Sequence, residues 1–206
     1  IGKAMLFIRF LIRTKQLICK KIARLIFQYP RILKYRLLST CKQISGRPKL
    51  YQPVQINGKG NVIFKQNVVI GVDSSPFLHN GYSYIDSRNV GSTIEVGKNC
   101  RINNNFIAIA ESEGIKIGDN VLIGLNCELI DSDFHDLDPF RRHLGGVAKK
   151  ARIIIGENVF IGSNVKIMKG VEIGKNSVIA NGSIVTKSIP DNVIAAGIPA
   201  KVIRTI

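Results

Sequence analysis

A spacing of six residues between branched aliphatic side chains constrains this chain more than any other feature of its sequence. The longest unbroken series runs through Ile155, Ile161, Ile167, Ile173, Ile179 and Val185. Glycine directly follows three of these positions, as Gly156, Gly162 and Gly174. Three earlier residues keep the same interval, namely Ile117, Ile123 and Leu129. An α-helix repeats about every 3.6 residues and a half-buried strand about every two, so neither explains a strict period of six.

A six-residue period is typical of parallel β-helices, in which three short strands close one triangular coil of about eighteen residues. Stacked coils share one continuous core, and each branched residue points into it. Weaker matches extend the pattern toward the N-terminus at Phe64, Ile70, Tyr84, Val90, Val96 and Ile102. We therefore predict an all-β fold in which residues 51–188 form a parallel β-helix. Residues 189–206, where Pro190 and Pro199 break the period, form a C-terminal cap.

The first fifty residues differ from the rest of the chain in charge. They hold thirteen of the 30 Lys and Arg residues and no Asp or Glu. Basic side chains recur at steps of four and seven, at Arg9, Arg13, Lys20, Arg24 and Arg31. An apolar series lies about 200° away around a helix and consists of Leu11, Ile18, Ile22 and Tyr29. We predict that residues 1–50 form a basic amphipathic helical segment, with Pro30 ending its helix.

Two kinds of partner suit such a helix. No uninterrupted apolar run reaches about 18 residues and no small-residue cleavage site follows, so we expect neither a transmembrane helix nor a standard signal peptide. Peripheral binding of residues 1–45 to an anionic membrane surface fits the charge. The alternative is a helix packed on its own domain or on a partner subunit. Nucleic-acid binding is not expected, because no aromatic stacking platform or known motif accompanies the charge.

The cysteines indicate the compartment. The four are scattered, at Cys19, Cys41, Cys100 and Cys127, and form no C-x-x-C pair. We expect them to be reduced core thiols. A cytoplasmic location follows, on the inner face of the cell membrane if the N-terminal helix binds lipid.

The period breaks once over a long stretch, and this interruption carries the candidate chemistry. Twenty-six residues separate Leu129 from Ile155, where six would have sufficed, so residues 130–150 form an inserted loop. Insertions in repeat proteins lie outside the core and often build the binding face. The loop holds His135. Histidine suits the work of a general base, because the unperturbed pKa of its residue type is about 6.5 and a neutral imidazole can accept a proton from an alcohol.

Four stretches of the chain resemble the hexapeptide-repeat acyltransferases. They are residues 103–106 (NNNF), 117–124 (IGDNVLIG), 135–141 (HDLDPFR), and the region from Ile161 to Arg204. The similarity is to maltose and galactoside O-acetyltransferases and to relatives that act on bacterial polysaccharides. It implies a left-handed parallel β-helix, assembly as a homotrimer, and acetyl-CoA as the co-substrate, with no metal required for catalysis.

The same resemblance assigns site residues. It implies that His135 is the general base, oriented by one of Glu128, Asp131, Asp133 and Asp136 or by a backbone carbonyl. Asn104 and Arg141 would bind the acceptor, although Arg141 and Arg142 have an equal claim to fixing the loop. The family's acidic acceptor-binding residue falls near Ser112, between Glu111 and Glu113, and this departure leaves the sugar undefined. Coenzyme A would lie between subunits against Ser163, Asn181, Thr186, Lys187, Lys201 and Arg204.

We therefore expect an acetyl-CoA-dependent O-acetyltransferase acting on a sugar or glycan hydroxyl, in bacterial surface polysaccharide biosynthesis. The alternatives are a serine O-acetyltransferase-like enzyme and a non-catalytic β-helix scaffold or membrane adaptor. A γ-class carbonic anhydrase shares the fold but needs three zinc-binding histidines. This chain has three in all, and His135 and His143 stand eight apart with Pro139 between them, while His79 lies in a second interruption of the period.

Overall fold

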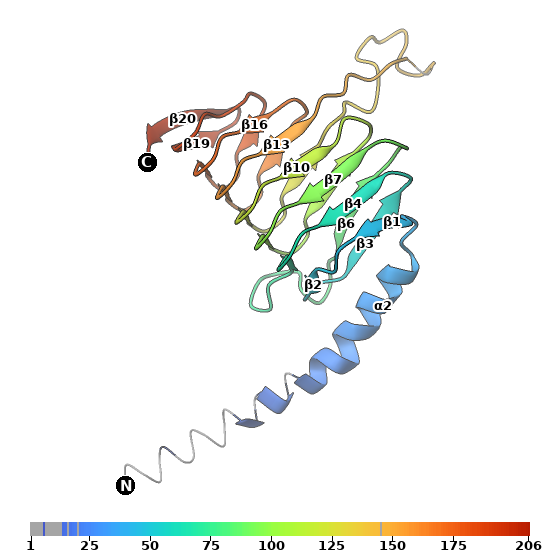
Figure 1. Ribbon diagram of the computed structural model, residues 1–206, viewed down its shortest axis with the longest axis vertical. Coiled ribbons are helices and arrows are strands. Elements are labelled where there is room, and N and C mark those ends of the chain that lie inside the picture. Colours follow the sequence, from blue (N-terminus) through green and yellow to red (C-terminus); the bar gives the residue numbers. More distant parts are fainter. Residues whose placement is uncertain (1–5, 7–13, 16, 20, 145) are drawn as a thin grey trace.

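The computed structural model describes residues 6, 14, 15, 17–19, 21–144 and 146–206. Three sheets form the sides of a prism, and the chain visits each side once per coil (Figure 1). All neighbouring strands are parallel except the last pair, which is antiparallel. The coil is a left-handed parallel β-helix, and the predicted fold class is confirmed.

The strands are two to six residues long and fall into three sheets. Sheet A contains β1 (Gln43–Ser45), β4 (Asn61–Phe64), β7 (Thr93–Val96), β10 (Ile115–Ile117), β13 (Ile153–Ile155) and β16 (Glu172–Ile173). Sheet B contains β2 (Lys49–Leu50), β5 (Val69–Ile70), β8 (Arg101–Ile102), β11 (Leu122–Ile123), β14 (Phe160–Ile161), β17 (Val178–Ile179), β19 (Val193–Gly197) and β20 (Ala200–Thr205). Sheet C contains β3 (Val54–Gly58), β6 (Ser83–Ser87), β9 (Ile107–Ala110), β12 (Glu128–Ile130), β15 (Lys166–Ile167) and β18 (Ile184–Val185).

The six-residue series points into the prism. Ile155, Ile161, Ile167, Ile173, Ile179 and Val185 are all fully buried in one continuous core. The register places apolar residues of successive coils directly beside one another, so that Ile117 pairs with Val96 on one side and Ile155 on the other. Each coil therefore buries its apolar side chains against the coils above and below it, as expected for a solenoid.

Asparagines occupy most of the tight corners. At the edge between sheets A and B, six of them have a positive φ: Asn67, Asn99, Asn120, Asn158, Asn176 and Asn192. Asn is one of the few non-glycine residues that adopts this left-handed conformation at low cost. Their amides also bond from coil to coil, as from Asn176 Nδ2 to Asn192 Oδ1 at 2.8 Å. The glycines serve a different need, because a Cβ on Gly124 would lie 2.5 Å from the backbone nitrogen of Ser163.

The weaker half of the periodic pattern was partly misassigned. Phe64, Ile70, Val96 and Ile102 are buried as predicted. Tyr84 faces outward, with Ile85 taking its place in the core, and Val90 is 82% exposed in a turn. The reason is that the connections from β5 to β6 and from β6 to β7 are longer than a regular corner, so the count of six restarts after each.

The N-terminal boundary and the end of the helix also differ from prediction. Strands β1 and β2 already belong to the prism, so the β-helix begins before residue 51. Pro30 does not end the helix, because it lies in the first turn of α2 (Tyr29–Leu37), directly after a π-helical turn η1 (Arg24–Gln28). Proline is tolerated there, since a first-turn N–H has no intrahelical partner.

The helix meets the prism through its polar side. Gln28, which is buried, donates from Nε2 to the carbonyl oxygens of Tyr51 at 2.7 Å and Leu78 at 2.9 Å. Arg31 donates to the carbonyl oxygen of Gly81 at 2.6 Å. Figure 1 shows α2 at the base of the prism, beside β1 and β3.

The predicted apolar face is left uncovered. Ile18, Ile22 and Tyr29 are all at least half exposed, and Leu11 lies outside the described residues, as do Arg9, Arg13 and Lys20 of the basic series. Among the helices described, none has the length and apolar character to cross a membrane.

Candidate active site

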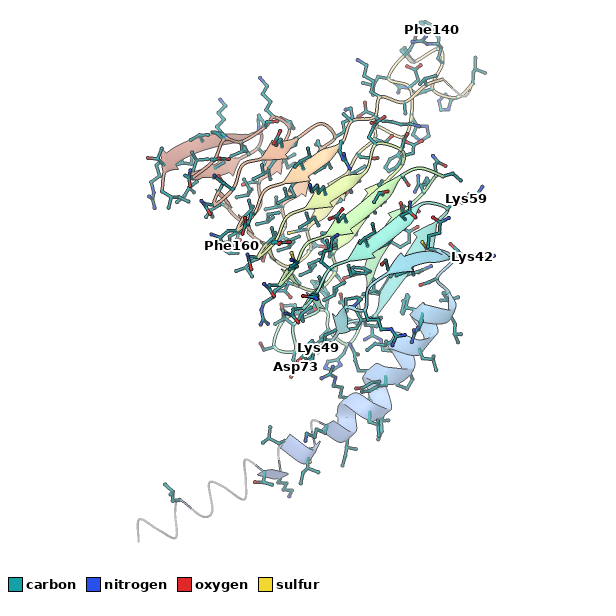
Figure 2. The ribbon with its side chains drawn as sticks, viewed as in Figure 1. Lys42, Lys49, Lys59, Asp73, Phe140 and Phe160 are labelled. Carbon is teal, nitrogen blue, oxygen red and sulfur yellow. The ribbon has the colours of Figure 1, made fainter. Side chains whose placement is uncertain are left out.

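The inserted loop leaves the prism at the edge where sheet C turns into sheet A. Shorter connections stack along this edge after β3, β6, β9, β15 and β18, and those after β6, β9 and β15 contact the loop. The loop between β12 and β13 projects beyond them, and Figure 2 shows Phe140 at its far end, well outside the prism. The side chains at the loop's base therefore meet residues from turns on the coils before and after.

Backbone and side-chain bonds close the neck of the loop. Ser132 forms an antiparallel bridge with Lys150. The N–H of Ala151 donates to the carbonyl oxygen of Asp131 at 2.9 Å. The Asp131 carboxylate is fully buried and accepts from the backbone N–H groups of Glu111 and Gly114 at 2.6 and 2.8 Å. Asp131 thus fixes the neighbouring turn, and a buried carboxylate is stable there because several N–H groups satisfy it.

Glu111 joins that turn to the loop. It accepts a hydrogen bond from Ser132 Oγ and pairs with Lys150 Nζ at 3.2 Å. Burial alone would raise its pKa, but the bonds from Ser132 and Lys150 and the charges of Lys150 and Arg88 outweigh burial and lower the pKa below its ordinary value. Glu111 is therefore a fixed anion at the base of the loop.

The two residues before His135 are also held. Lys169 Nζ donates to Asp133 Oδ1 at 2.6 Å, from the turn after β15. Phe134 has a φ of 60°, a conformation that bulky side chains rarely adopt. The guanidinium of Arg88 lies 4.9 Å from the centre of its ring, and Arg88 in turn pairs with the buried Asp86 at 3.0 Å.

His135 is presented to solvent at this fixed point. Its backbone N–H donates to the carbonyl oxygen of Asp133 at 2.7 Å, and its side chain is exposed rather than turned into the core. A shallow pocket of about 330 Å³ adjoins it, lined also by Asp136, Leu137, Arg142 and His143.

None of the four carboxylates proposed to orient the imidazole does so within the described chain. Glu128 pairs with Lys166 at 3.0 Å, and Asp133 pairs with Lys169. Asp136 pairs with Arg141 at 3.2 Å. Asp131 serves the backbone of the neighbouring turn. The prediction of a carboxylate partner is therefore not met in the single chain.

Asn104 has a structural role instead of the predicted acceptor-binding one. It is fully buried. Its amide donates to the carbonyl oxygens of Val72, Ser75 and Pro76, the last at 2.8 Å, and accepts from the N–H of Val72. With both ends of the amide used to hold the 71–82 loop, Asn104 cannot reach a substrate.

Arg141 fastens the inserted loop. Its Nε lies 3.2 Å from Asp136 Oδ2 and 3.1 Å from Asp138 Oδ2. The structure thus supports the loop-fixing role and not the acceptor-binding role that the sequence also allowed.

The residues predicted to bind coenzyme A fall in three places on one chain. Ser163 and Asn181 stack at the edge between sheets B and C, where the Ser163 N–H donates to Asn181 Oδ1 at 2.7 Å. Thr186 and Lys187 follow β18 at the edge that carries the inserted loop. Lys201 and Arg204 lie on β20 and are exposed. One chain does not bring these six side chains together.

Sequence reasoning missed the residues that brace the loop. Glu111 is 21 residues from Ser132 and Lys169 is 36 residues from Asp133. Arg88 is still further from Phe134 in sequence, and all three lie in turns that the hexapeptide pattern does not mark. Only the stacking of coils brings them to one edge. Within the described residues, no three His, Cys, Asp or Glu side chains gather in a geometry that could hold a metal ion.

Comparison with known proteins places this geometry in context. A family model described as the hexapeptide repeat of succinyl-transferase matches residues 114–130 and 152–187. The galactoside O-acetyltransferase of Escherichia coli K12 is 37% identical over 172 residues, which are 80% of this chain and 79% of that protein.

Solved structures show the same architecture. A maltose O-acetyltransferase from Clostridium difficile 630 is 28% identical, with a TM-score of 0.51 over 95% of this chain and 88% of that one. A hexapeptide-repeat acetyltransferase of Vibrio cholerae O1 biovar eltor, solved with acetyl coenzyme A, is 36% identical, with a TM-score of 0.51 over 54% of this chain and 60% of that one.

Proposed function

This chain belongs to the hexapeptide-repeat acetyltransferases, and from that premise we propose that it transfers an acetyl group from acetyl-CoA to a sugar hydroxyl, with His135 as the general base. Relatives named for galactoside and maltose support a carbohydrate acceptor. A structural neighbour solved with acetyl coenzyme A supports the donor.

The proposed reaction is direct transfer. His135 takes the proton of the sugar hydroxyl as its oxygen attacks the thioester carbonyl of acetyl-CoA. The tetrahedral intermediate collapses, the carbon–sulfur bond breaks, and the departing thiolate of coenzyme A takes from the imidazolium the proton that came from the sugar. A positioned base of this kind supplies about 10² to 10⁴-fold in rate.

One observation carries the proposal: the loop is anchored on both sides of its neck, and His135 stands just beyond the anchored Asp133 with an exposed side chain. A base must be held in place to act, because a shift of about 1 Å can cost about 10² in rate. The contacts at Lys169, Arg88 and Glu111 provide that restraint.

We also propose a homotrimer with coenzyme A between subunits. The predicted donor-binding residues lie on two different edges and on β20, so a single ligand could meet them only across an interface between chains. The exposed His135 agrees with this, because a neighbouring subunit would complete the cleft around it.

A peripheral membrane location is part of the same proposal and suits surface polysaccharide assembly in the cytoplasm. The helix uses its polar side to bind the prism, which leaves Ile18, Ile22 and Tyr29 facing away from it. Apolar side chains beside basic ones favour an anionic lipid surface. The double variant Ile18→Ser with Ile22→Ser should float less with vesicles that contain phosphatidylserine than the wild type does. The control is Phe160→Ser, which removes an exposed apolar side chain of sheet B and should leave flotation unchanged. Equal flotation of all three proteins would exclude the anchor.

The acceptor class is tested by measuring thiol release from acetyl-CoA with sugars, nucleotide sugars and serine. We expect thiol release to require a sugar, and we expect mass spectrometry to detect the acetylated sugar as the product. Release with serine alone would favour the serine O-acetyltransferase alternative. Acetyl-CoA binding without turnover on any acceptor would favour a scaffold.

A further inference from the structure

A second hollow lies on the outer face of sheet C, at the edge opposite the inserted loop. Its volume is about 470 Å³. The residues that shape it are Asn80, Tyr82, Tyr84, Asn105, Ile107 and Asn126. In Figure 2, Asp73 marks the 71–82 loop that forms one wall, and this loop and the loop bearing Phe140 leave the prism at different places.

The wall of this pocket is braced by the N-terminal helix. Arg31 holds the carbonyl oxygen of Gly81 at 2.6 Å. The ring of Tyr35 stacks on that of Tyr82, with centroids 4.3 Å apart and planes 24° from parallel. Tyr82 is therefore fixed from behind, although 38% of it remains exposed.

The chemistry of the lining is uncharged, in a chain with a formal net charge of +16. The phosphates of a nucleotide would find no cation here to pair with. Tyrosine rings present apolar faces with a polar tip, and side-chain amides offer both donors and acceptors. This combination suits the apolar C–H faces and the many hydroxyls of a neutral saccharide.

Part of the polar capacity is unused within the described chain. Asn80 has no hydrogen-bond or ion-pair partner there. The contact of Asn105 with Gln52 uses the carbonyl end of the Asn105 amide, at 3.2 Å. The contact of Asn126 with Asn164 uses the amino end of the Asn126 amide, at 3.0 Å. Each amide keeps its other end for a ligand.

Strand β9 joins this pocket to the catalytic edge. Asn105 precedes the strand, and Ile107 and Ile109 line the pocket from its outer face while Ala108 and Ala110 are buried. The next residue, Glu111, bonds to Ser132 at the neck of the His135 loop. At about 3.3 Å per residue, four strand residues span about 13 Å, which is the length of two to three sugar units.

We propose that this pocket is a distal saccharide subsite, which binds an oligomeric glycan acceptor along the outer face of β9 while one of its units is presented at the His135 edge. The inference rests on the proposed function for the identity of the reacting site. It adds that the acceptor is an oligosaccharide, because a monosaccharide would fill only one end of this path and an oligosaccharide would reach both ends.

The test uses malto-oligosaccharides and β-galacto-oligosaccharides of one to six units with the full chain. In the accepted series we expect kcat/KM to rise at least tenfold between one unit and three or more. Asn80→Ala removes an unpartnered amide, and Tyr82→Ala removes the aromatic face. Both should raise KM for the longer acceptors by at least fivefold and leave kcat, the shortest acceptor and the KM for acetyl-CoA unchanged. Tyr82→Phe, which keeps the stacked ring, should lose much less.

Binding measured without turnover separates this idea from the proposed function. Saturation-transfer NMR with His135→Ala should show the same oligosaccharides bound, with the signal reduced by Asn80→Ala. Binding with no acetylation by the wild type would contradict the proposed function and support the subsite. The subsite would be overturned if kcat/KM did not depend on acceptor length, or if it depended on length in the same way in the wild type, Asn80→Ala and Tyr82→Ala. It would also be overturned if a neighbouring subunit were found to cover the pocket residues.

Discussion

Lys169 Nζ donates a hydrogen bond to Asp133 Oδ1 at 2.6 Å, and this contact ties the inserted loop to the turn after β15. The other carboxylate oxygen of Asp133 is buried and has no hydrogen-bond partner among the described residues. Removing the lysine would leave a poorly solvated carboxylate unpaired two residues before His135, so the neck of the loop would have to rearrange.

We predict that Lys169→Met lowers kcat for sugar acetylation by about tenfold to a hundredfold, because a small misplacement of the base is costly. The matched control is Lys166→Met, which breaks the more exposed pair with Glu128 at 3.0 Å on the neighbouring strand. That variant should stay within about twofold, as exposed ion pairs contribute little. Equal losses in the two variants would argue against a role for Asp133 in placing His135.

The backbone of Phe134 gives a second prediction. Its φ of 60° is disfavoured for a side chain, and glycine adopts it freely. Phe134→Val should therefore reduce kcat more than Phe134→Gly, because a β-branched residue adds about 1–2 kcal/mol of left-handed strain. Comparing kcat of the two variants tests this. Both variants lose the ring contact with Arg88, so that contact cannot order them, and the reverse order would contradict the argument from backbone strain.

The left-handed conformation of the corner asparagines predicts how substitutions there change the free energy of unfolding. Asn176 has a φ of 59° and bonds to Asn158 and Asn192. Asn176→Val should lower the free energy of unfolding by about 1–2 kcal/mol more than Asn176→Gly, since only valine is strained there. Lys175→Val, one residue earlier and also exposed, is the control and should cost little. Urea unfolding of the three variants gives the comparison.

The buried thiols predict a loss of stability in alkali. Burial raises the pKa of Cys100 and Cys127 to about 11 each. In the unfolded chain they ionise at a lower pH, so their neutral forms stabilise the folded state fully below that value, and this contribution is lost as the pH rises through about 11. The Tm should fall less steeply between pH 9 and 11 in Cys100→Ala with Cys127→Ala than in the wild type. An unchanged slope would contradict the burial argument, and Cys19→Ala, which removes the exposed thiol, is the control.

The prism could be predicted from the sequence because its period is set by the core itself. Ile155 to Val185 keep strict intervals since each of the three sides of every coil must present a branched residue to the same interior. The pattern failed at Tyr84 and Val90, where longer connections reset the count. Pro30 was misread for a local reason: proline disfavours a helix interior but suits its first turn.

The candidate site was only partly predictable. The long interruption pointed to His135, because an insertion in a solenoid has to lie outside the core. Asn104 looked like a binding residue in a run of asparagines, yet its amide holds the 71–82 loop. The residues that brace His135 come from three other coils, and such contacts follow from stacking in space, which a single sequence does not display.

In the proposed reaction His135 removes the proton from the acceptor hydroxyl, and the decisive measurement is the single-turnover rate of transfer from acetyl-CoA to an accepted sugar. His135→Ala should lose about 10² to 10⁴-fold in rate with unchanged binding of acetyl-CoA. His143→Ala, in the same loop, should retain the wild-type rate. Transfer by His135→Ala at the wild-type rate would contradict a role for His135 as the general base.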